Sequence, residues 1–324
     1  MSENGNQRSG NEEPVKKKKK KSALPFIFII IGCAAVLTFA LIQIIRTQME
    51  YKHSSDLTNN VIDQIVVTET PKETASGSDT PAEEPEPFRY DHQAAIAMNP
   101  DAKGLINIPS TGIMLPIVQK LNDASNEYYL HRGFDGNYSR AGTVYIDTNI
   151  KEGLEARHVI LYGHHMGDGT MFSDNDLYRD AAFYKQPGND VFYIYTPETV
   201  QEYKIFAVYT PEATGDTYTI NFGSDDELQE FAKKWKSYSI YDTGADVSKA
   251  KRVVTLSSCD IKTNYKLRLV VQGVLVRETK DGKEISVEPE TKKATEATES
   301  SETVQETEAV EVVETEIIEE TVSQ

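Results

Sequence analysis

The alternation of hydrophobic and polar residues divides this chain of 324 residues into distinct regions. Residues 23–45 form an apolar run without a single charge, whereas residues 88–285 mix short apolar runs with polar positions. Polar stretches at 46–87 and 286–324 lie on either side of the mixed region. The pattern predicts one long apolar helix, followed by a linker, a folded domain and a tail.

Strand signals dominate the mixed region. Its apolar positions alternate with polar ones or are β-branched, and Gly, Pro, Asn and Asp separate the runs. About eight strands in one domain predict a closed barrel or a sandwich. The expected strands are 104–108, 114–119, 142–147, 158–162, 190–196, 200–210, 252–257 and 267–276.

Two helical segments are expected beside these strands. The first follows Phe88 and ends before Asn99 and Pro100. The second covers 225–237, because Ser224 is a suitable N-cap and acidic residues in the first turn favour the helix dipole. The polar residues 46–60 are compatible with a continuation of the apolar helix.

The apolar run at 23–45 is long enough to cross a bilayer, which needs about 20 apolar helical residues. Arg8 and six lysines precede it within residues 1–22, and this excess of positive charge predicts a cytoplasmic N-terminus. A cleaved secretory signal is the alternative, but its apolar region is usually about 7–15 residues long and ends at a small-residue cleavage site. We therefore expect a single-pass anchor in the plasma membrane, with the folded domain outside the cell.

The amino-acid composition argues against several classes of protein. The formal net charge of -17 argues against nucleic-acid binding, which needs a basic face. Two cysteines, Cys33 and Cys259, are too few for a disulfide framework or a cysteine-rich zinc module.

Residues 68–87 are rich in Thr, Pro, Glu and Ser, as linkers are. The tail at 286–324 repeats Glu and Thr with few large apolar residues, which predicts disorder.

Residues with catalytic potential lie at the ends of expected strands. Cys259 closes a β-branched run at 253–255, so it is either a buried small apolar residue or a nucleophile. His164 and His165 follow an apolar strand and a glycine, which suits an acid or base, a surface histidine or half of a metal site. Arg268 opens the last strand, where it either stabilises an oxyanion or forms a surface ion pair.

The order of these residues narrows the enzyme classes. The histidines come first, Cys259 follows 95 positions after His164, and Arg268 lies just beyond. Papain-like enzymes have the cysteine before the histidine, and caspases need a Gln-Ala-Cys sequence that is absent here.

With these residues the chain resembles the sortases, the membrane-anchored transpeptidases of Gram-positive bacteria. The similarity is to class B and extends from Phe88 to about Arg277, with a departure at Leu105, where the class often has tryptophan. The sequences that carry it are NPD at 99–101, GLI at 104–106, LPIVQ at 115–119, NEYYL at 126–130, GTVYID at 142–147, YGHHMGDGTMF at 162–172, the helix at 225–237, YDTG at 241–244 and TLSSCD at 255–260 followed by Arg268.

The resemblance implies a mostly β fold, a closed eight-stranded barrel with an N-terminal helix and a helix before the cysteine strand. It implies Cys259 as the nucleophile, His164 as the acid and base, and Arg268 as the stabilising cation. His164 is preferred to His165 because the family histidine directly follows the Tyr-Gly pair. Matching positions of the class B substrate groove are Asn126, Leu130, Tyr162, Tyr218 and Ser257.

The implied activity is cleavage of a C-terminal sorting signal on exported proteins through a thioester, followed by transfer to an amine of a peptidoglycan precursor or a pilin. Class B relatives commonly use signals similar to Asn-Pro-x-Thr. Partners would be the signal peptide, the amine acceptor and the membrane, without nucleic acid, metal or cofactor. Two alternatives stay open: a thiol peptidase that hydrolyses the signal, and a membrane-tethered barrel that binds without catalysis.

Overall fold

The computed structural model describes residues 24–67, 88–259 and 266–285 of the chain. The predicted basic segment at 1–22, the Thr- and Pro-rich part of the linker at 68–87, and the acidic tail at 286–324 lie outside the described residues. The strands are β1 (Val66–Val67), β2 (Arg89–Tyr90), β3 (Ala102–Ile108), β4 (Ile113–Val118), β5 (Val144–Ile146), β6 (His158–Tyr162), β7 (Val191–Tyr195), β8 (Val200–Tyr209), β9 (Val253–Cys259), β10 (Arg268–Lys280) and β11 (Lys283–Glu284).

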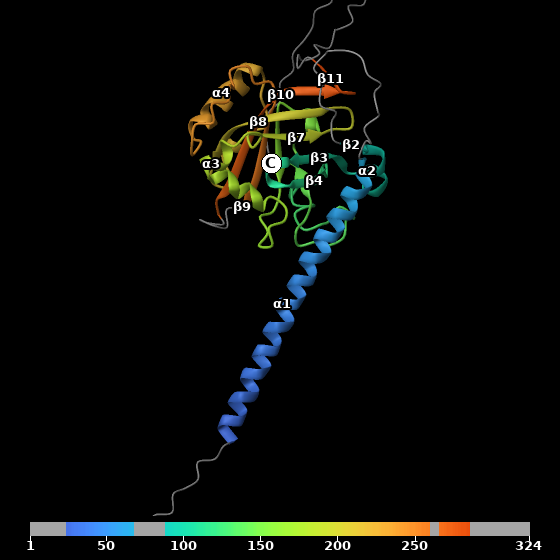
Figure 1. Cartoon of the computed structure of the whole chain (residues 1–324), viewed down its shortest axis with the longest axis vertical. Coiled ribbons are helices and arrows are strands. Elements are labelled where there is room, and N and C mark those ends of the chain that lie inside the picture. The colour runs from blue at the N-terminus through green and yellow to red at the C-terminus, as the bar shows by residue number, and fades with distance from the viewer. Residues whose placement is uncertain (1–23, 68–87, 260–265, 286–324) are drawn as a thin grey trace, which may run out of the picture. The chain divides into compact units, whose positions relative to one another are not determined.

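Eight of the described strands close into a barrel (Figure 1). Their order is β10-β8-β7-β3-β4-β5-β6-β9, and β9 pairs with β10 to complete the ring. The β4–β5 and β6–β9 pairs are parallel, and the other pairs of the ring are antiparallel. The predicted fold class, a closed eight-stranded barrel, is confirmed.

Each predicted strand is present, with shifted ends. β9 continues through Cys259, which places the candidate nucleophile inside a strand, and β10 continues to Lys280. Asp281 and Gly282 then take positive φ angles of 52° and 72°. An Asp-Gly pair with two positive φ angles is the favoured two-residue hairpin turn, and it leads into β11.

The two-residue period of the strands separates an inner from an outer set of side chains. In β3, Ile106 and Ile108 pack in the cluster that fills the barrel, whereas Leu105 packs in a second cluster outside it. In β4, Leu115 and Ile117 belong to the inner cluster. Both faces of β3 and β4 are therefore packed in apolar clusters.

Helices cover the outer face of the barrel. They are α1 (Leu24–Ile65), α2 (His92–Met98), α3 (Ala181–Tyr184) and α4 (Asp225–Ser237), with short 3-10 turns η1 (Pro109–Thr111), η2 (Gly153–Glu155), η3 (Ser173–Arg179) and η4 (Asp216–Tyr218). The helices predicted between Phe88 and Asn99 and at 225–237 are present as α2 and α4, and the hydroxyl of Ser224 accepts a hydrogen bond from the Glu227 amide at 3.3 Å. Figure 1 shows α4 beside β8, where Trp235 stacks on Tyr209 at 4.9 Å between ring centroids.

The helix α1 is continuous from the apolar run into the folded domain. Its first part is long and apolar enough to cross a membrane, by length and composition. Its last turns pack on the barrel: Ser54, Val61 and Ile65 are buried, at the spacing of one helix face. The antiparallel pair β1–β2 then joins residues 66–67 to 89–90. That residues 46–87 form an extracellular linker stays a prediction.

Candidate active site

Two parallel neighbours, β6 and β9, bring His164 and Cys259 to the same end of the barrel. Tyr162 lies opposite Ser257 in the register, and the Gly163 amide donates to the Ser257 carbonyl at 3.1 Å. His164 and Cys259 each follow this matched pair by two residues. Residues 95 positions apart in the chain are therefore brought to the same edge of the barrel.

The adjacent strand β10 adds Arg268 to this end of the barrel. β10 runs antiparallel to β9, and Arg268 is the Cα partner of Cys259. The guanidinium donates from Nη1 to the Leu267 carbonyl at 3.1 Å, and its positive charge contributes to lowering the pKa of His164. The three residues predicted to be catalytic thus meet at one edge.

Gly163 allows the chain to turn tightly between β6 and His164. A Cβ at this position would lie 2.5 Å from the ring of Phe172, a contact too short for a real side chain. Phe172 is fully buried, and its amide donates to the His164 carbonyl at 2.9 Å. Glycine is therefore required for the Tyr-Gly-His turn to close over an aromatic ring.

The imidazole of His164 contacts two consecutive residues, Leu130 and His131. Its Nε2 donates to the Leu130 carbonyl at 2.9 Å, and its ring stacks on His131 at 5.4 Å between centroids. Burial lowers the pKa of His164 below its ordinary value, the charges of His131 and Arg268 lower it further, and the Leu130 hydrogen bond opposes them. The neutral imidazole is therefore the main form at neutral pH.

His165 faces a different partner. Its Nε2 lies 2.7 Å from Oδ2 of Asp176, and Oδ1 of the same carboxylate accepts from Nε of Arg179 at 2.9 Å. The side chains of His165 and Asp176 are almost completely buried, at 8% and 9% exposure. The side-chain partner of His165 thus lies in η3, away from Leu130 and His131, which contact the neighbouring His164.

Asn126 and Tyr162 converge on one buried carboxylate, Asp147. The Asn126 amide donates to Oδ2 of Asp147 at 2.9 Å, and the Tyr162 hydroxyl donates to the same oxygen at 3.1 Å. The Asn126 oxygen accepts from the Thr148 amide at 2.8 Å. Asn126 has a positive φ of 53°, a conformation that asparagine adopts more readily than most residues.

Tyr218 and Ser257 extend this group of residues toward β9. The Tyr218 hydroxyl lies 3.0 Å from the hydroxyl of Ser257, and its ring stacks on Tyr162 at 6.1 Å between centroids. Hydrogen bonds to Asp147 and Ser257 and the stacked rings thus link four of the five predicted groove residues, and the fifth, Leu130, binds His164. Their contact with a substrate stays a prediction.

Sequence reasoning gave no role to two residues of this site, Asp147 and His131. Both border sequences used for the resemblance, because Asp147 closes GTVYID and His131 directly follows NEYYL. The sequence did offer one signal for Asp147, since it is a polar residue at the end of a strand close to the strand that leads to His164. The site residues that they contact, Tyr162 and Asn126 for Asp147 and His164 for His131, lie 15 to 33 positions away, so no local spacing revealed these contacts.

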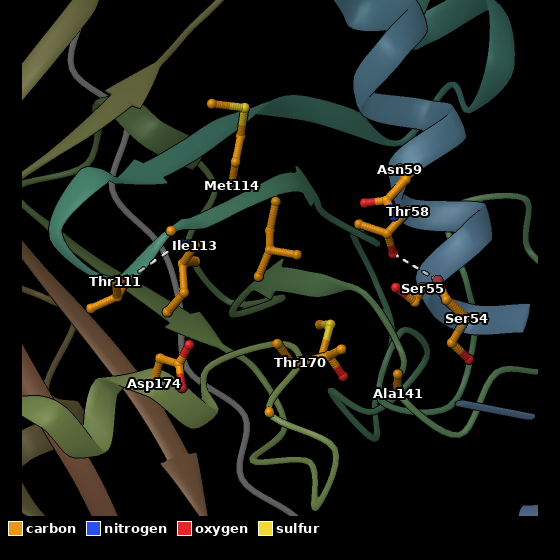
Figure 2. A pocket seen from close by; sticks show the side chains of 14 residues that line it. Ser54, Ser55, Thr58, Asn59, Thr111, Ile113, Met114, Ala141, Thr170 and Asp174 are labelled. Atoms are coloured by element: carbon orange, nitrogen blue, oxygen red, sulfur yellow. Dashed lines mark hydrogen bonds between the residues drawn. The ribbon is translucent and has the colours of Figure 1, made fainter. Parts of the chain in front are cut away.

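A separate pocket of about 200 Å³ lies between α1 and β4 (Figure 2). Ser54 and Thr58 of α1 face Ile113 and the residues near Thr170 across it. None of the eight predicted site residues lines this pocket. The candidate site is therefore assigned from the strand register and the hydrogen bonds described above.

Comparison with known proteins agrees with this geometry. The family model of the sortase domain matches residues 106–276, which is more than half of the chain. The chain belongs to the sortase family. Sortase B of Listeria monocytogenes is 37% identical over 183 residues, which cover 55% of this chain and 71% of that protein. Sortase B of Staphylococcus aureus is 25% identical over 193 residues, 59% of this chain and 77% of the relative.

Solved structures give the same class. Sortase B of Bacillus anthracis in complex with AAEK1 aligns with a TM-score of 0.55 and 30% identity, covering 70% of this chain and 98% of that one. A Staphylococcus aureus sortase B–substrate complex aligns with a TM-score of 0.51 and 25% identity, covering 57% of this chain and 84% of the other. This sortase is therefore of class B, as the motifs predicted.

Proposed function

We propose that this class B sortase is a cysteine transpeptidase that cleaves a C-terminal sorting signal and transfers the acyl group to an amine. The observation that carries the proposal is the register at the end of the barrel. Cys259 stands between a parallel strand that leads to His164 and an antiparallel strand that begins at Arg268. A nucleophile, a base and a cation on adjacent strands meet the needs of acyl transfer.

In the first step the sulfur of Cys259 attacks a backbone carbonyl of the signal. A C–S bond forms, the C–N bond of the peptide breaks, and the amine leaves with a proton supplied by His164. Since Nε2 of His164 donates to the Leu130 carbonyl, Nδ1 is the atom that takes the thiol proton and passes it to the leaving amine.

In the second step an acceptor amine attacks the thioester. The C–N bond forms, the C–S bond breaks, neutral His164 takes the proton of the amine, and the thiol is restored. Arg268 donates hydrogen bonds where negative charge develops on the carbonyl oxygen in both steps. The lowered pKa of His164 suits this step, because the unprotonated ring is the form that acts as a base.

The substrate groove is formed by Asn126, Leu130, Tyr162, Tyr218 and Ser257. Stacked aromatic rings with a few fixed polar groups are suited to an extended peptide, since the rings supply contact area and the polar groups supply orientation. The apolar part of α1 would hold the enzyme at the outer face of the plasma membrane, where exported proteins and amines of a peptidoglycan precursor or a pilin are accessible.

The test is thioester formation on the full-length chain in detergent or lipid nanodiscs. Peptides of the Asn-Pro-x-Thr type are screened by mass spectrometry for an acyl adduct on Cys259. Cys259→Ala should give no adduct, whereas Cys33→Ser, a matched change in α1, should behave like the parent.

Product analysis with and without an added amine then separates transfer from hydrolysis. An amide product that appears only with the amine supports a transpeptidase, and exclusive release of the free acid would support a thiol peptidase. A Cys259→Ala variant that still exchanges peptide would disprove the assignment of the nucleophile.

A further inference from the structure

A second histidine lies directly against the candidate acid and base. The rings of His131 and His164 are 5.4 Å apart between centroids with an angle of 25° between their planes, so they form an offset stack. His131 itself is exposed to solvent. The residue before it, Leu130, supplies the carbonyl that accepts from His164 Nε2.

The backbone around His131 is held firmly although its side chain is exposed. The Ser139 amide donates to the His131 carbonyl at 3.1 Å. Gly142 packs so closely on this segment that a Cβ there would lie 2.4 Å from the Leu130 oxygen. The hydroxyl of Ser139 is in turn 3.0 Å from that of Ser54 in α1. The backbone that carries the His131 ring is thus fixed relative to His164.

We propose that His131 is a positioning residue for His164, fixing the plane of its ring and disfavouring its protonated form. This inference rests on the transpeptidase function proposed above. A hydrogen bond at Nε2 alone leaves the ring free to rotate about that bond, whereas a ring stacked on its face removes this freedom. Two restraints from consecutive residues, Leu130 and His131, therefore define the direction in which Nδ1 points.

The charge effect follows from the same contact. A second imidazole against the face of His164 displaces water from it and opposes a positive charge on it. The other group whose charge acts on His164 is Arg268 of β10, and Cys259 is the titratable residue that the β9 register places beside it. His165 is engaged with Asp176. Removal of His131 should therefore raise the pKa of His164.

The experiment uses the full-length chain in lipid nanodiscs with ¹³C-labelled histidine. His131→Phe keeps an aromatic ring against His164 but removes the charge, and His131→Gln removes both. His53→Phe is the matched control, because His53 is an exposed residue of α1. The titration of each of the six histidines is followed by NMR. In parallel, kcat/KM for a quenched Asn-Pro-x-Thr peptide is measured against pH.

We expect the pKa of His164 to rise by about 0.3–1 unit in both His131 variants and to stay unchanged in His53→Phe. The acidic limb of kcat/KM should move to higher pH by the same amount, because neutral His164 is the form that takes the thiol proton in the proposed first step. A purely structural loss would lower the rate at every pH without moving the limb.

Titration curves and acidic limbs of both variants that coincide with the parent within roughly 0.1 unit would overturn the inference. Failure of the proposed function is a different result, namely no peptide exchange that depends on Cys259. In that case the NMR titration still decides whether His131 controls the protonation of His164.

Discussion

The strand β6 leads to a histidine at each of its ends, and the two are used in opposite ways. His158 opens the strand and is fully buried, with Nδ1 donating to the Thr219 carbonyl at 2.6 Å and Nε2 lying 2.7 Å from the Thr255 hydroxyl. His164 follows the other end, is half-buried, and has one ring nitrogen bound, to Leu130, among the described contacts. Burial lowers the pKa of both rings, that of His158 to about 4.

The difference separates a structural from a chemical histidine. When both nitrogens are bound to protein, as in His158, the ring can neither give nor take a proton without breaking the core. When one nitrogen is bound, as in His164, the other is available to a substrate while its orientation stays fixed. The same residue type on the same strand is thus assigned to two roles by the partners around it.

The largest effect should come from His164→Gln. We expect kcat/KM for peptide exchange to fall by about 10²–10⁴-fold, the usual contribution of a general acid–base group. The free energy of unfolding should change by less than about 1 kcal/mol, because the residue is half-buried and at the barrel edge. Steady-state kinetics and urea unfolding of the same preparation measure both quantities.

Arg268→Lys should follow, with a loss of about 10²-fold in kcat. A lysine keeps the positive charge but cannot reproduce the planar fork of donors that a developing oxyanion needs. The measurement is single-turnover acylation, with thermal unfolding as the control for folding. A rate within about twofold of the parent would contradict the assigned role.

His158→Gln should instead alter the pH dependence of stability. The pKa of His158 is lowered in the folded protein from 6.5 to about 4, so below pH 6.5 the unfolded chain takes up a proton that the folded chain does not. Stability from this group is therefore complete above pH 6.5 and decreases as the pH falls toward 4. The difference corresponds to about 3 kcal/mol.

The check is urea unfolding of parent and His158→Gln at a series of pH values. The variant should be destabilised most at neutral pH, and its disadvantage should shrink toward pH 4. Its kcat per folded molecule should stay close to that of the parent, in contrast to His164→Gln. A constant stability difference across the series would mean that His158 is not held neutral.

The smallest effect is expected for Asp147→Asn. Asn126 and Tyr162 both donate to one carboxylate oxygen of Asp147, and an amide can accept from both only with weaker geometry. We expect KM to rise by about tenfold with kcat nearly unchanged, because the groove is disturbed and the reacting groups are not. Asp246→Asn, at an exposed site outside the groove, serves as the matched control.

The sequence predicted the barrel well because its strands obey a local rule. Apolar runs that alternate with polar residues or are β-branched, separated by Gly, Pro, Asn and Asp, located the barrel strands, and the capping serine at 224 located α4. The pair β1–β2 was not predicted, since each strand has two residues and their partner lies across residues 68–87. The continuation of β9 through Cys259 also escaped, because Ser257 and Ser258 look like a strand end.

The residues of the candidate site likewise fall into those that local motifs predict and those that only the fold reveals. His164, Cys259 and Arg268 were found from their order and from motifs at strand ends. The roles of His131 and Asp147 depend on contacts between distant segments, which no periodicity reports. The different roles of His158 and His164 could not be predicted either. Both lie at ends of the same strand, and only their hydrogen-bond partners distinguish them.

The docking of α1 has a practical consequence for anyone preparing a water-soluble fragment. Val61, Ile65 and Ala95 lie in one cluster with Tyr195, so cutting the chain at the start of β3 would remove all three and expose Tyr195 to solvent. Ser139 would lose Ser54, and with it one support of the loop that presents His131. A fragment that begins one turn before Ser54 keeps the packing of α1 on the barrel and omits the apolar half of the helix.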